Sequence, residues 1–378
     1  MKRFPAYDPP EYLDWSPDPE ENQRFRAPFE DSDRARVLEA LGRDRLLGLY
    51  RHLLRTRLHD IGLKRWVRTG VISKAWLGTG EEAVTVGTVA ALDPDRDVVS
   101  PMIRNAGALL MMGMSMEDAF RGNLASADSP SRGRDLHIGD LSKNILQPIS
   151  HMGTNVAVVA GLALAFRIRN ERRVALTWVG DGATKTAACH EGLTLAAVRR
   201  VPAVFVIQNN QVALGTRASV HGRGDLRAWA RAYGIPSLQC DGNNVLDVHA
   251  AATLAVERCR GGEGPVVLLA ETFRMGGHAT HDEREARETF PKALFEHWGR
   301  RDPVGLFEEF LRSEGVAEEE LVRIEEEVTS EVDTAEEAAR SSRRRSPTPE
   351  MVLYDDFSEG FPLIGLEKRP TGVEWSIK

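Results

Sequence analysis

The sequence contains few cysteines, and they show no pairing pattern. Among 378 residues there are three, Cys189, Cys240 and Cys259, and none stands in a CxxC arrangement. Disulfide frameworks and cysteine-based zinc sites need more cysteines at closer spacing, so the sequence argues against both. This usage predicts a reducing compartment, the cytoplasm.

Long apolar runs and a positive charge excess are also missing. No run of about 18 apolar residues occurs, which argues against a membrane-spanning helix. The first residues, MKRFPAYDPPEYLDW, lack the apolar core of a signal peptide. Lys and Arg number 49 against 56 Asp and Glu, and no basic stripe is visible, so no nucleic-acid partner is expected. The absence of a GxGxxG after an early predicted strand argues against an ordinary dinucleotide-binding domain.

What the sequence does contain is a strand, turn, helix and strand pattern between Arg173 and Thr216. Apolar runs at 174–179 and 203–207 predict two strands, and residues 187–200 predict a helix between them. This order is typical of one βαβ unit in a parallel sheet. Further strands are predicted at 97–100, 235–240 and 266–271.

Polar residues follow both strands of this unit. The first strand ends in Gly180-Asp181-Gly182-Ala183, and the second ends in Asn209-Asn210. The glycines would let the backbone turn sharply and approach a ligand closely, and the following helix would favour a phosphate at its amino end. A carboxylate and an amide oxygen beside phosphates suit Mg²⁺. The pattern predicts a magnesium-diphosphate site. The alternative is a plain βαβ turn in which Asp181 caps the following helix and Asn209-Asn210 is a loop.

The spacing of GDG and NN, with Asn210 placed 29 positions after Asp181, resembles the thiamine diphosphate fingerprint. The wider stretch, GDGAT…HEGLTLAAVRRVPAVFVIQNNQVALGT, resembles the alpha subunit of the E1 component of 2-oxo acid dehydrogenase complexes. This resemblance covers roughly residues 45–365. It implies an α/β thiamine diphosphate-binding fold, with a mainly parallel sheet and helices on both faces.

The resemblance also implies site residues. Asp181, Asn210 and the main-chain carbonyl of Val212 would ligate Mg²⁺. Arg104 would contact the diphosphate, which suits a guanidinium fork. The cofactor-binding positions carried over are Ile103, Arg104, Ser150, Met152, Gly180, Asp181, Gly182, Ala183, Asn210, Val212 and His278.

Two histidines are the implied catalytic residues. His278 lies in a glycine-containing loop after the strand predicted at 266–271, and this loop resembles the family's YRxxGHSxSDxxxYR segment. There it would act near the reactive carbon of the cofactor, and the alternative is a loop histidine that only shapes the mouth of the site. His137, in the loop 128–143, resembles the histidine of a second active-site loop.

Several positions depart from the family pattern and suggest a divergent subgroup. Glu81 stands where the family usually has His or Gln, at the start of a predicted helix. Lys74 is either a surface residue or a replacement for an apolar substrate-pocket residue. The other departures are Ile103, Ala106 and the triplet Lys185-Thr186-Ala187.

The implied function is thiamine diphosphate-dependent oxidative decarboxylation of a 2-oxo acid, either pyruvate or a branched-chain acid, with acyl transfer to a lipoyl-bearing E2 protein. A separate beta subunit would supply the activating glutamate in an α2β2 heterotetramer. The alternatives are an acetoin-dehydrogenase-type alpha subunit and a catalytically silent scaffold subunit.

Three segments are expected along the chain. Residues 1–33 contain prolines, acids and aromatics without a period and predict an extended arm packed on the body or on a partner. Residues 34–330 form the predicted α/β domain. Residues 331–378 are predicted to be a helical and docking tail, because charged helical residues lead into an apolar end.

Overall fold

A five-stranded parallel sheet forms the centre of the protein in the computed structural model, which describes residues 1–222 and 224–354. Its strands lie in the order β1-β2-β3-β7-β6, and each neighbouring pair is parallel. The bounds are β1 (Val98–Ser100), β2 (Ala175–Gly180), β3 (Ala203–Asn209), β6 (Ser237–Asp241) and β7 (Val266–Glu271). All five predicted strands are therefore present.

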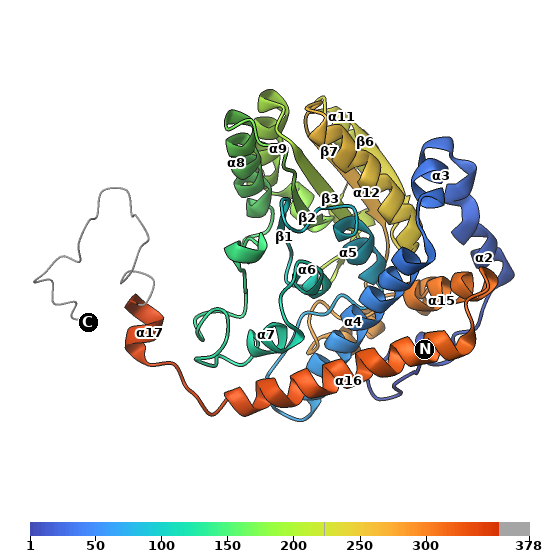
Figure 1. The fold of residues 1–378 in the computed structure, drawn as a ribbon, viewed down its shortest axis with the longest axis vertical. Coiled ribbons are helices and arrows are strands. Elements are labelled where there is room, and N and C mark those ends of the chain that lie inside the picture. Colours follow the sequence, from blue (N-terminus) through green and yellow to red (C-terminus); the bar gives the residue numbers. More distant parts are fainter. Residues whose placement is uncertain (223, 355–378) are drawn as a thin grey trace, which may run out of the picture.

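Helices cover both faces of this sheet, which confirms the predicted α/β class (Figure 1). One face is covered by α8 (Thr154–Ile168), α9 (Ala187–Arg199) and α11 (Leu226–Arg231), whose buried residues form one cluster with those of the strands. The other packs against α12 (Val245–Arg260), which in turn contacts α5 (Glu82–Val89). Because both faces are covered, the strands are apolar along nearly their whole length, as buried parallel strands usually are.

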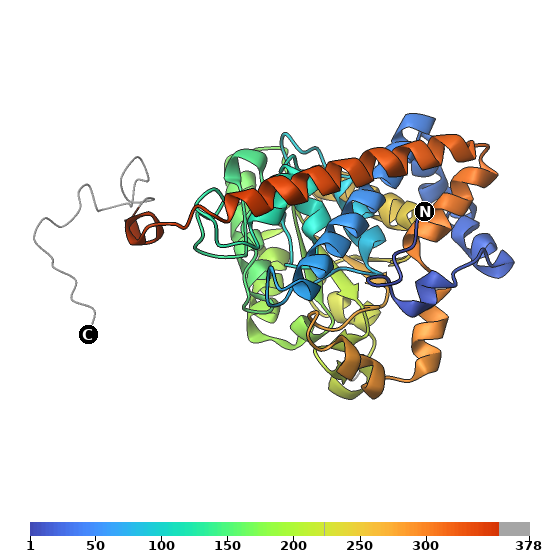
Figure 2. The same ribbon diagram turned by 90° about the horizontal axis from the view of Figure 1, so that it is seen from below.

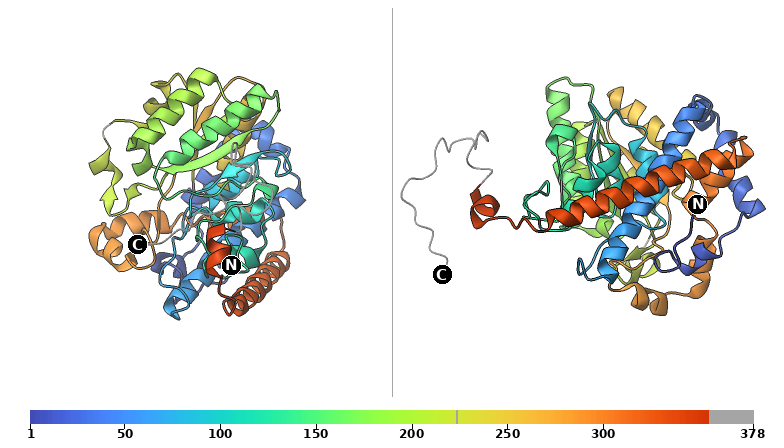
Figure 3. Two further views of the ribbon diagram at one scale, coloured as in Figure 1. Left: turned by 90° about the vertical axis from the view of Figure 1, so that its left-hand side faces the viewer. Right: turned by 60° about the horizontal axis from the view of Figure 1, so that its bottom comes forward.

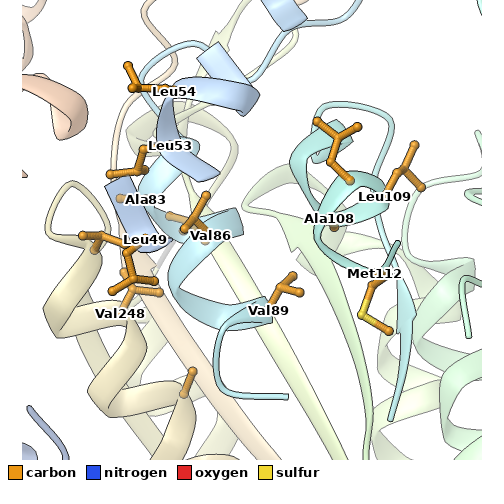
Figure 4. Close-up of a cluster of buried hydrophobic side chains, with 14 of the residues drawn as sticks. Leu49, Leu53, Leu54, Ala83, Val86, Val89, Ala108, Leu109, Met112 and Val248 are labelled. Carbon is orange, nitrogen blue, oxygen red and sulfur yellow. The ribbon is translucent and has the colours of Figure 1, made fainter. Parts of the chain in front are cut away.

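The larger hydrophobic core lies on the α12 side of the sheet. It includes residues of α4 (Arg43–Arg68), α5, α6 (Ala106–Met111) and α12 (Figure 4). Gly87 permits the close contact of α5 with α12, because a Cβ built there would lie 2.7 Å from Val248. This packing places the amino end of α5 next to the sheet edge where the strands end.

The first 33 residues are a series of short helices that pack on the protein's own body. They are α1 (Pro10–Leu13), α2 (Pro19–Arg26), η1 (Ala27–Glu30) and the start of α3 (Ser32–Glu39), in place of the expected extended arm. Proline opens both α1 and α2, where its missing N–H is not needed, and Asp18 caps α2. Phe25 is buried against Phe310 of α15 (Pro303–Ser313).

The C-terminal part is dominated by α16 (Glu318–Ser342), a long helix that crosses α4 and α7 (Met116–Arg121) (Figure 2). Ion pairs such as Arg51–Glu327 and Arg55–Glu331 join it to α4. It continues through residues 330 and 331, where the sequence suggested a segment boundary. α17 (Pro349–Tyr354) projects beyond the end of α16 in Figures 1 and 2 and in the right-hand view of Figure 3, and the rest of the predicted docking tail, 355–378, lies outside the described residues.

Shorter elements complete the chain. Around the carboxyl edge of the sheet lie η3 (Gly182–Lys185), the small antiparallel pair β4 (Val212–Ala213) and β5 (Thr216–Arg217), and α10 (Ala218–His221). The remainder are η2 (Leu141–Lys143), α13 (Glu283–Thr289) and α14 (Lys292–Gly299). Within the described ranges, no helix is both long and apolar enough to cross a membrane.

Candidate active site

A cavity of about 550 Å³ opens at the edge where β1, β2, β3 and β7 end. The register aligns these ends, since Gly180 of β2 pairs with Gln208 of β3, and Gln208 pairs with Ala270 of β7. All of the site residues predicted from the sequence line this one cavity: Ile103, Arg104, His137, Ser150, Met152, Gly180, Asp181, Gly182, Ala183, Asn210, Val212 and His278. The fold thus brings them together from six separate segments of chain, while their individual roles stay predictions.

Asp181 follows β2 directly, and its side chain is only 2% exposed. It does not cap the helix, as the alternative from the sequence would require, because its side chain makes no capping hydrogen bond to η3. Instead, Oδ2 lies 2.7 Å from Nε2 of His221 in α10. The helix α9 begins later and is capped by Thr186. The carboxylate is therefore held at the cavity by a side chain that the sequence did not single out.

The two glycines that flank Asp181 have different surroundings. Neither has a backbone φ in the left-handed region, so neither is needed to make the turn. A Cβ at Gly180 would meet nothing within 4 Å, whereas one at Gly182 would lie 2.6 Å from Cβ of Ala213. Gly180 therefore keeps open the space next to the cavity, and Gly182 allows β4 to pack closely.

The other two predicted metal ligands, Asn210 directly after β3 and Val212 in β4, also line the cavity. The side-chain amide of Asn210 donates to Oε1 of Glu81 at 2.8 Å, and its oxygen accepts from the main-chain N–H of Val212 at 3.3 Å. The carbonyl of Val212 accepts from Arg274 at 3.3 Å. A carboxylate, an amide oxygen and a carbonyl are the hard oxygen donors that suit Mg²⁺.

These donors do not form a complete metal site by themselves. Over the described parts of the chain, no group of three or more His, Cys, Asp and Glu side chains could hold a metal ion. A cation bound here would therefore need further oxygens from a ligand. A diphosphate supplies such oxygens, so the donor set fits a magnesium-diphosphate pair.

Two buried guanidinium groups provide the positive charge that a diphosphate requires. Arg104 donates to the carbonyls of Leu77 at 2.6 Å and His278 at 3.2 Å. Arg274 donates to the carbonyl of Leu214 at 2.8 Å, and both arginines line the cavity. Burial, together with the charge of Arg104, lowers the pKa of Arg274 to about 10. Sequence reasoning missed Arg274, although its place four residues before His278 in the same loop was a usable signal.

His278 lines the cavity, and its ring feels the positive charges of Arg104 and Arg274. Burial is the main cause that lowers the pKa of His278 to about 4, and Arg104 and Arg274 lower it further. The imidazole is therefore neutral near pH 7.

His137 is held by two partners that the sequence did not identify. Its Nδ1 lies 2.9 Å from Oδ1 of Asp135, and its Nε2 lies 3.0 Å from Oγ of Ser150. Asp135 thus orients the ring, and Ser150 connects this loop to the segment before α8.

The remaining wall of the cavity is largely apolar, with Trp76, Met102, Ile149 and Trp178 among its lining residues. The indole Nε1 of Trp178 and Oδ1 of Asn155, both buried, find no hydrogen-bond partner within the described chain. Lys74 is exposed and lies over the ring of Trp76 at 5.1 Å, so it reaches the site only through that tryptophan.

Comparisons with known proteins identify the family of the chain. The family model described as dehydrogenase E1 component matches residues 50–348. The chain is 32% identical over 325 residues to "Pyruvate dehydrogenase E1 component subunit alpha" of Zymomonas mobilis, covering 84% of this chain and 90% of that protein. It is 30% identical to "2-oxoisovalerate dehydrogenase subunit alpha" of Bacillus subtilis, covering 78% of this chain and 92% of that protein.

A third relative, from Acholeplasma laidlawii, also carries the name "Pyruvate dehydrogenase E1 component subunit alpha" and is 33% identical, covering 77% of this chain and 83% of that protein. These names favour neither the acetoin-type alternative nor the silent scaffold. Since the family model spans most of the chain and the relatives are matched over most of their length, the chain belongs to the dehydrogenase E1 component family, as an alpha subunit of the 2-oxo acid dehydrogenase type.

Proposed function

We propose that this chain binds magnesium and thiamine diphosphate in the cavity at the strand ends and takes part in the oxidative decarboxylation of a 2-oxo acid. The observation that carries the proposal is the convergence of Asp181, Asn210 and Arg104 on one cavity from three different strand ends. Bound thiamine diphosphate supplies the carbon nucleophile and electron sink that this decarboxylation needs, and the protein binds and orients it.

Each group of residues has a proposed task. Asp181, Asn210 and the carbonyl of Val212 hold the metal, and Arg104 neutralises the diphosphate. The main chain at Ile103, Ser150 and Met152, with Gly180, Gly182 and Ala183, shapes the remaining contacts with the cofactor. His278 and His137 move protons at the reactive end.

The chain is proposed to act with a beta subunit, in an α2β2 heterotetramer, and with a lipoyl-bearing E2 protein. The glutamate that activates the cofactor is expected on the beta subunit. The substrate is a 2-oxo acid of the pyruvate or branched-chain type, and the apolar wall around Trp76 and Met102 suits an apolar side chain. The three cysteines are buried and unpaired, which supports a reducing compartment such as the cytoplasm.

The first test concerns the metal. Asp181→Ala should abolish magnesium-dependent binding of thiamine diphosphate in titration calorimetry, because it removes the only carboxylate among the proposed ligands. Unchanged affinity would show that the metal is held elsewhere. Asp118→Ala, at an ion-paired position on α7 away from the cavity, is the matched control and should bind like the wild type.

The second test concerns the partner. The purified chain alone should show negligible decarboxylation of pyruvate or 3-methyl-2-oxobutanoate, and activity should appear when its beta subunit is added. Robust turnover by the single chain, proportional to its concentration, would contradict the assignment of the activating group to another subunit.

A further inference from the structure

Glu81 lies directly behind the wall of the cavity and contacts two residues that line it. Its side chain is 1% exposed and comes from the residue before α5. Its Oε1 accepts from the side-chain amides of Asn210 and Gln208, and its Oε2 lies 3.7 Å from a guanidinium nitrogen of Arg104. The side chain makes no capping bond to α5, so the helix itself does not explain this buried carboxylate.

The contact with Asn210 determines which end of that amide faces the proposed metal. The oxygen and nitrogen ends of an amide have nearly the same shape, so their hydrogen-bond partners decide its orientation. An ionised carboxylate only accepts hydrogen bonds, so the amide nitrogen of Asn210 must turn toward Glu81. The oxygen then points to the opposite side, where the N–H of Val212 also donates to it at 3.3 Å.

The contact with Arg104 concerns the diphosphate half of the site. Oε2 of Glu81 is buried and has no hydrogen-bond donor within the described residues, so the guanidinium of Arg104 is its nearby counter-charge. Arg104 also donates to the carbonyls of Leu77 and His278. The position of this arginine therefore depends on Glu81 together with two main-chain groups.

We propose that Glu81 is a positioning residue that turns the oxygen of Asn210 toward the magnesium ion and holds Arg104 toward the diphosphate. The inference rests on the proposed function and extends it to a residue that does not itself line the cavity. Glu81 would couple the metal and phosphate halves of the site through one buried carboxylate.

The resembled family usually has His or Gln at this position, but in this chain Asn210, Gln208 and Arg104 all present donors to residue 81, so a glutamine could not satisfy them although it has the same shape as Glu81. If its oxygen faced Asn210 and Gln208, its NH₂ group would face the cation Arg104. If it were turned over, its NH₂ group would face two amide nitrogens that also donate. Either orientation places donors against donors in a buried site, where unmatched polar groups are costly.

The experiment uses the full chain assembled with its beta subunit and measures magnesium and thiamine diphosphate affinity by calorimetry. Glu81→Gln should weaken magnesium-dependent cofactor binding by about 10- to 100-fold, the usual effect of removing a group that orients a metal ligand. Glu336→Gln is the matched control. Glu336 is also buried, it accepts from Nε1 of Trp66 at 2.6 Å, and it lies on α16 away from the cavity. This control should lose stability in thermal melting without losing cofactor affinity.

A swapped pair separates positioning from a general loss of structure. Asn210→Asp alone should bind weakly, because it places two carboxylates against each other. Combining it with Glu81→Gln replaces the two facing carboxylates by an NH₂ donor and a carboxylate acceptor and leaves only the amide of Gln208 facing another donor, so the double variant should bind more tightly than Asn210→Asp alone. Such rescue is a non-additive effect between contacting residues.

The outcomes are distinguishable. If the wild-type assembly fails to bind magnesium and thiamine diphosphate, the proposed function fails. If the wild type binds but Glu81→Gln binds equally well, or the double variant binds no better than Asn210→Asp, the positioning role is wrong while the proposed function stands.

Discussion

The two glycines beside Asp181 allow a sharp test, because the structure assigns them opposite consequences for one substitution. Gly180 lines the cavity, and a Cβ there would have no neighbour within 4 Å. A Cβ at Gly182 would lie 2.6 Å from Cβ of Ala213, far inside van der Waals contact. The prediction is that Gly180→Ala impairs binding without harming the fold, and Gly182→Ala harms the fold.

The magnitudes follow from these distances. Gly180→Ala meets no steric conflict with other parts of the chain, so restricting the unfolded chain should raise the free energy of unfolding by about 0.4–1 kcal/mol. Gly182→Ala must push β4 outward, and overpacking of this kind lowers the free energy of unfolding by about 1–3 kcal/mol. The two variants should therefore differ in melting temperature by several degrees, in opposite directions from the wild type.

Gly180→Ala should weaken cofactor binding even though it stabilises the fold. The methyl group of Gly180→Ala would enter the open space that the proposed cofactor needs. An overpacking cost of about 1–3 kcal/mol would weaken thiamine diphosphate binding by about 5- to 150-fold. Thermal melting without ligand and calorimetry with magnesium and thiamine diphosphate measure the two effects separately.

Gly48→Ala supplies the control. Gly48 lies within α4, a Cβ there would also have no neighbour within 4 Å, and the residue does not line the cavity. This variant should gain about 1 kcal/mol of stability as a helical Gly→Ala change and should bind the cofactor normally. The reasoning is refuted if Gly180→Ala binds like the wild type, or if it destabilises the fold as much as Gly182→Ala does.

Two further predictions concern histidines. His278→Ala in the assembly with the beta subunit should leave thiamine diphosphate affinity within a few-fold, because the metal ligands and Arg104 are untouched, while acyl transfer to a lipoyl acceptor falls by about 10²–10⁴. Transfer near the wild-type rate would make His278 a structural residue and leave His137 or the partner chain as the proton donor. His249 is buried on α12, and burial, with a smaller contribution from Arg45, lowers its pKa to about 4 from an ordinary value of 6.5. The unfolded chain therefore takes up a proton at this residue between pH 6.5 and pH 4 while the folded chain does not, so the folded state loses stability on acidification through this window, on the order of 2–3 kcal/mol at pH 4. His249→Gln should flatten the pH dependence of the free energy of unfolding measured in urea, and an unchanged slope would contradict the assignment.

Most of the strands and helices that form the site could be predicted from the sequence. The apolar runs on either side of Gly180-Asp181-Gly182 became β2 and β3, because a strand buried on both faces must be apolar along its length. The helix predicted between them is α9. The residues of the candidate site were also predictable, since the spacing of Asp181 and Asn210 and the loop around His278 resemble a family whose fold brings strand ends together.

The N-terminal segment was harder to predict. Residues 1–33 have no apolar period, so the sequence suggested an extended arm. The segment does pack on the body, as its aromatics suggested, since Tyr12 and Phe25 are buried. It forms the short helices α1 and α2, however, because helices of this length are stabilised by tertiary contacts more than by local propensity.

The contacts between distant segments could come only from the tertiary structure. The sequence alone determined the fold class, the strand ends that carry polar residues and the two loops with histidines, since each depends on local pattern or on the spacing of a motif. The order of strands, with β7 between β3 and β6, depends on how the whole chain crosses over the sheet. That order and the packing of α5 decided that Glu81 reaches Asn210, that Arg274 reaches the carbonyl of Val212, and that His221 reaches Asp181. These partners are 129, 62 and 40 positions apart in the chain, and side chains so separated meet only when burial of the apolar core has set the positions of the elements that carry them.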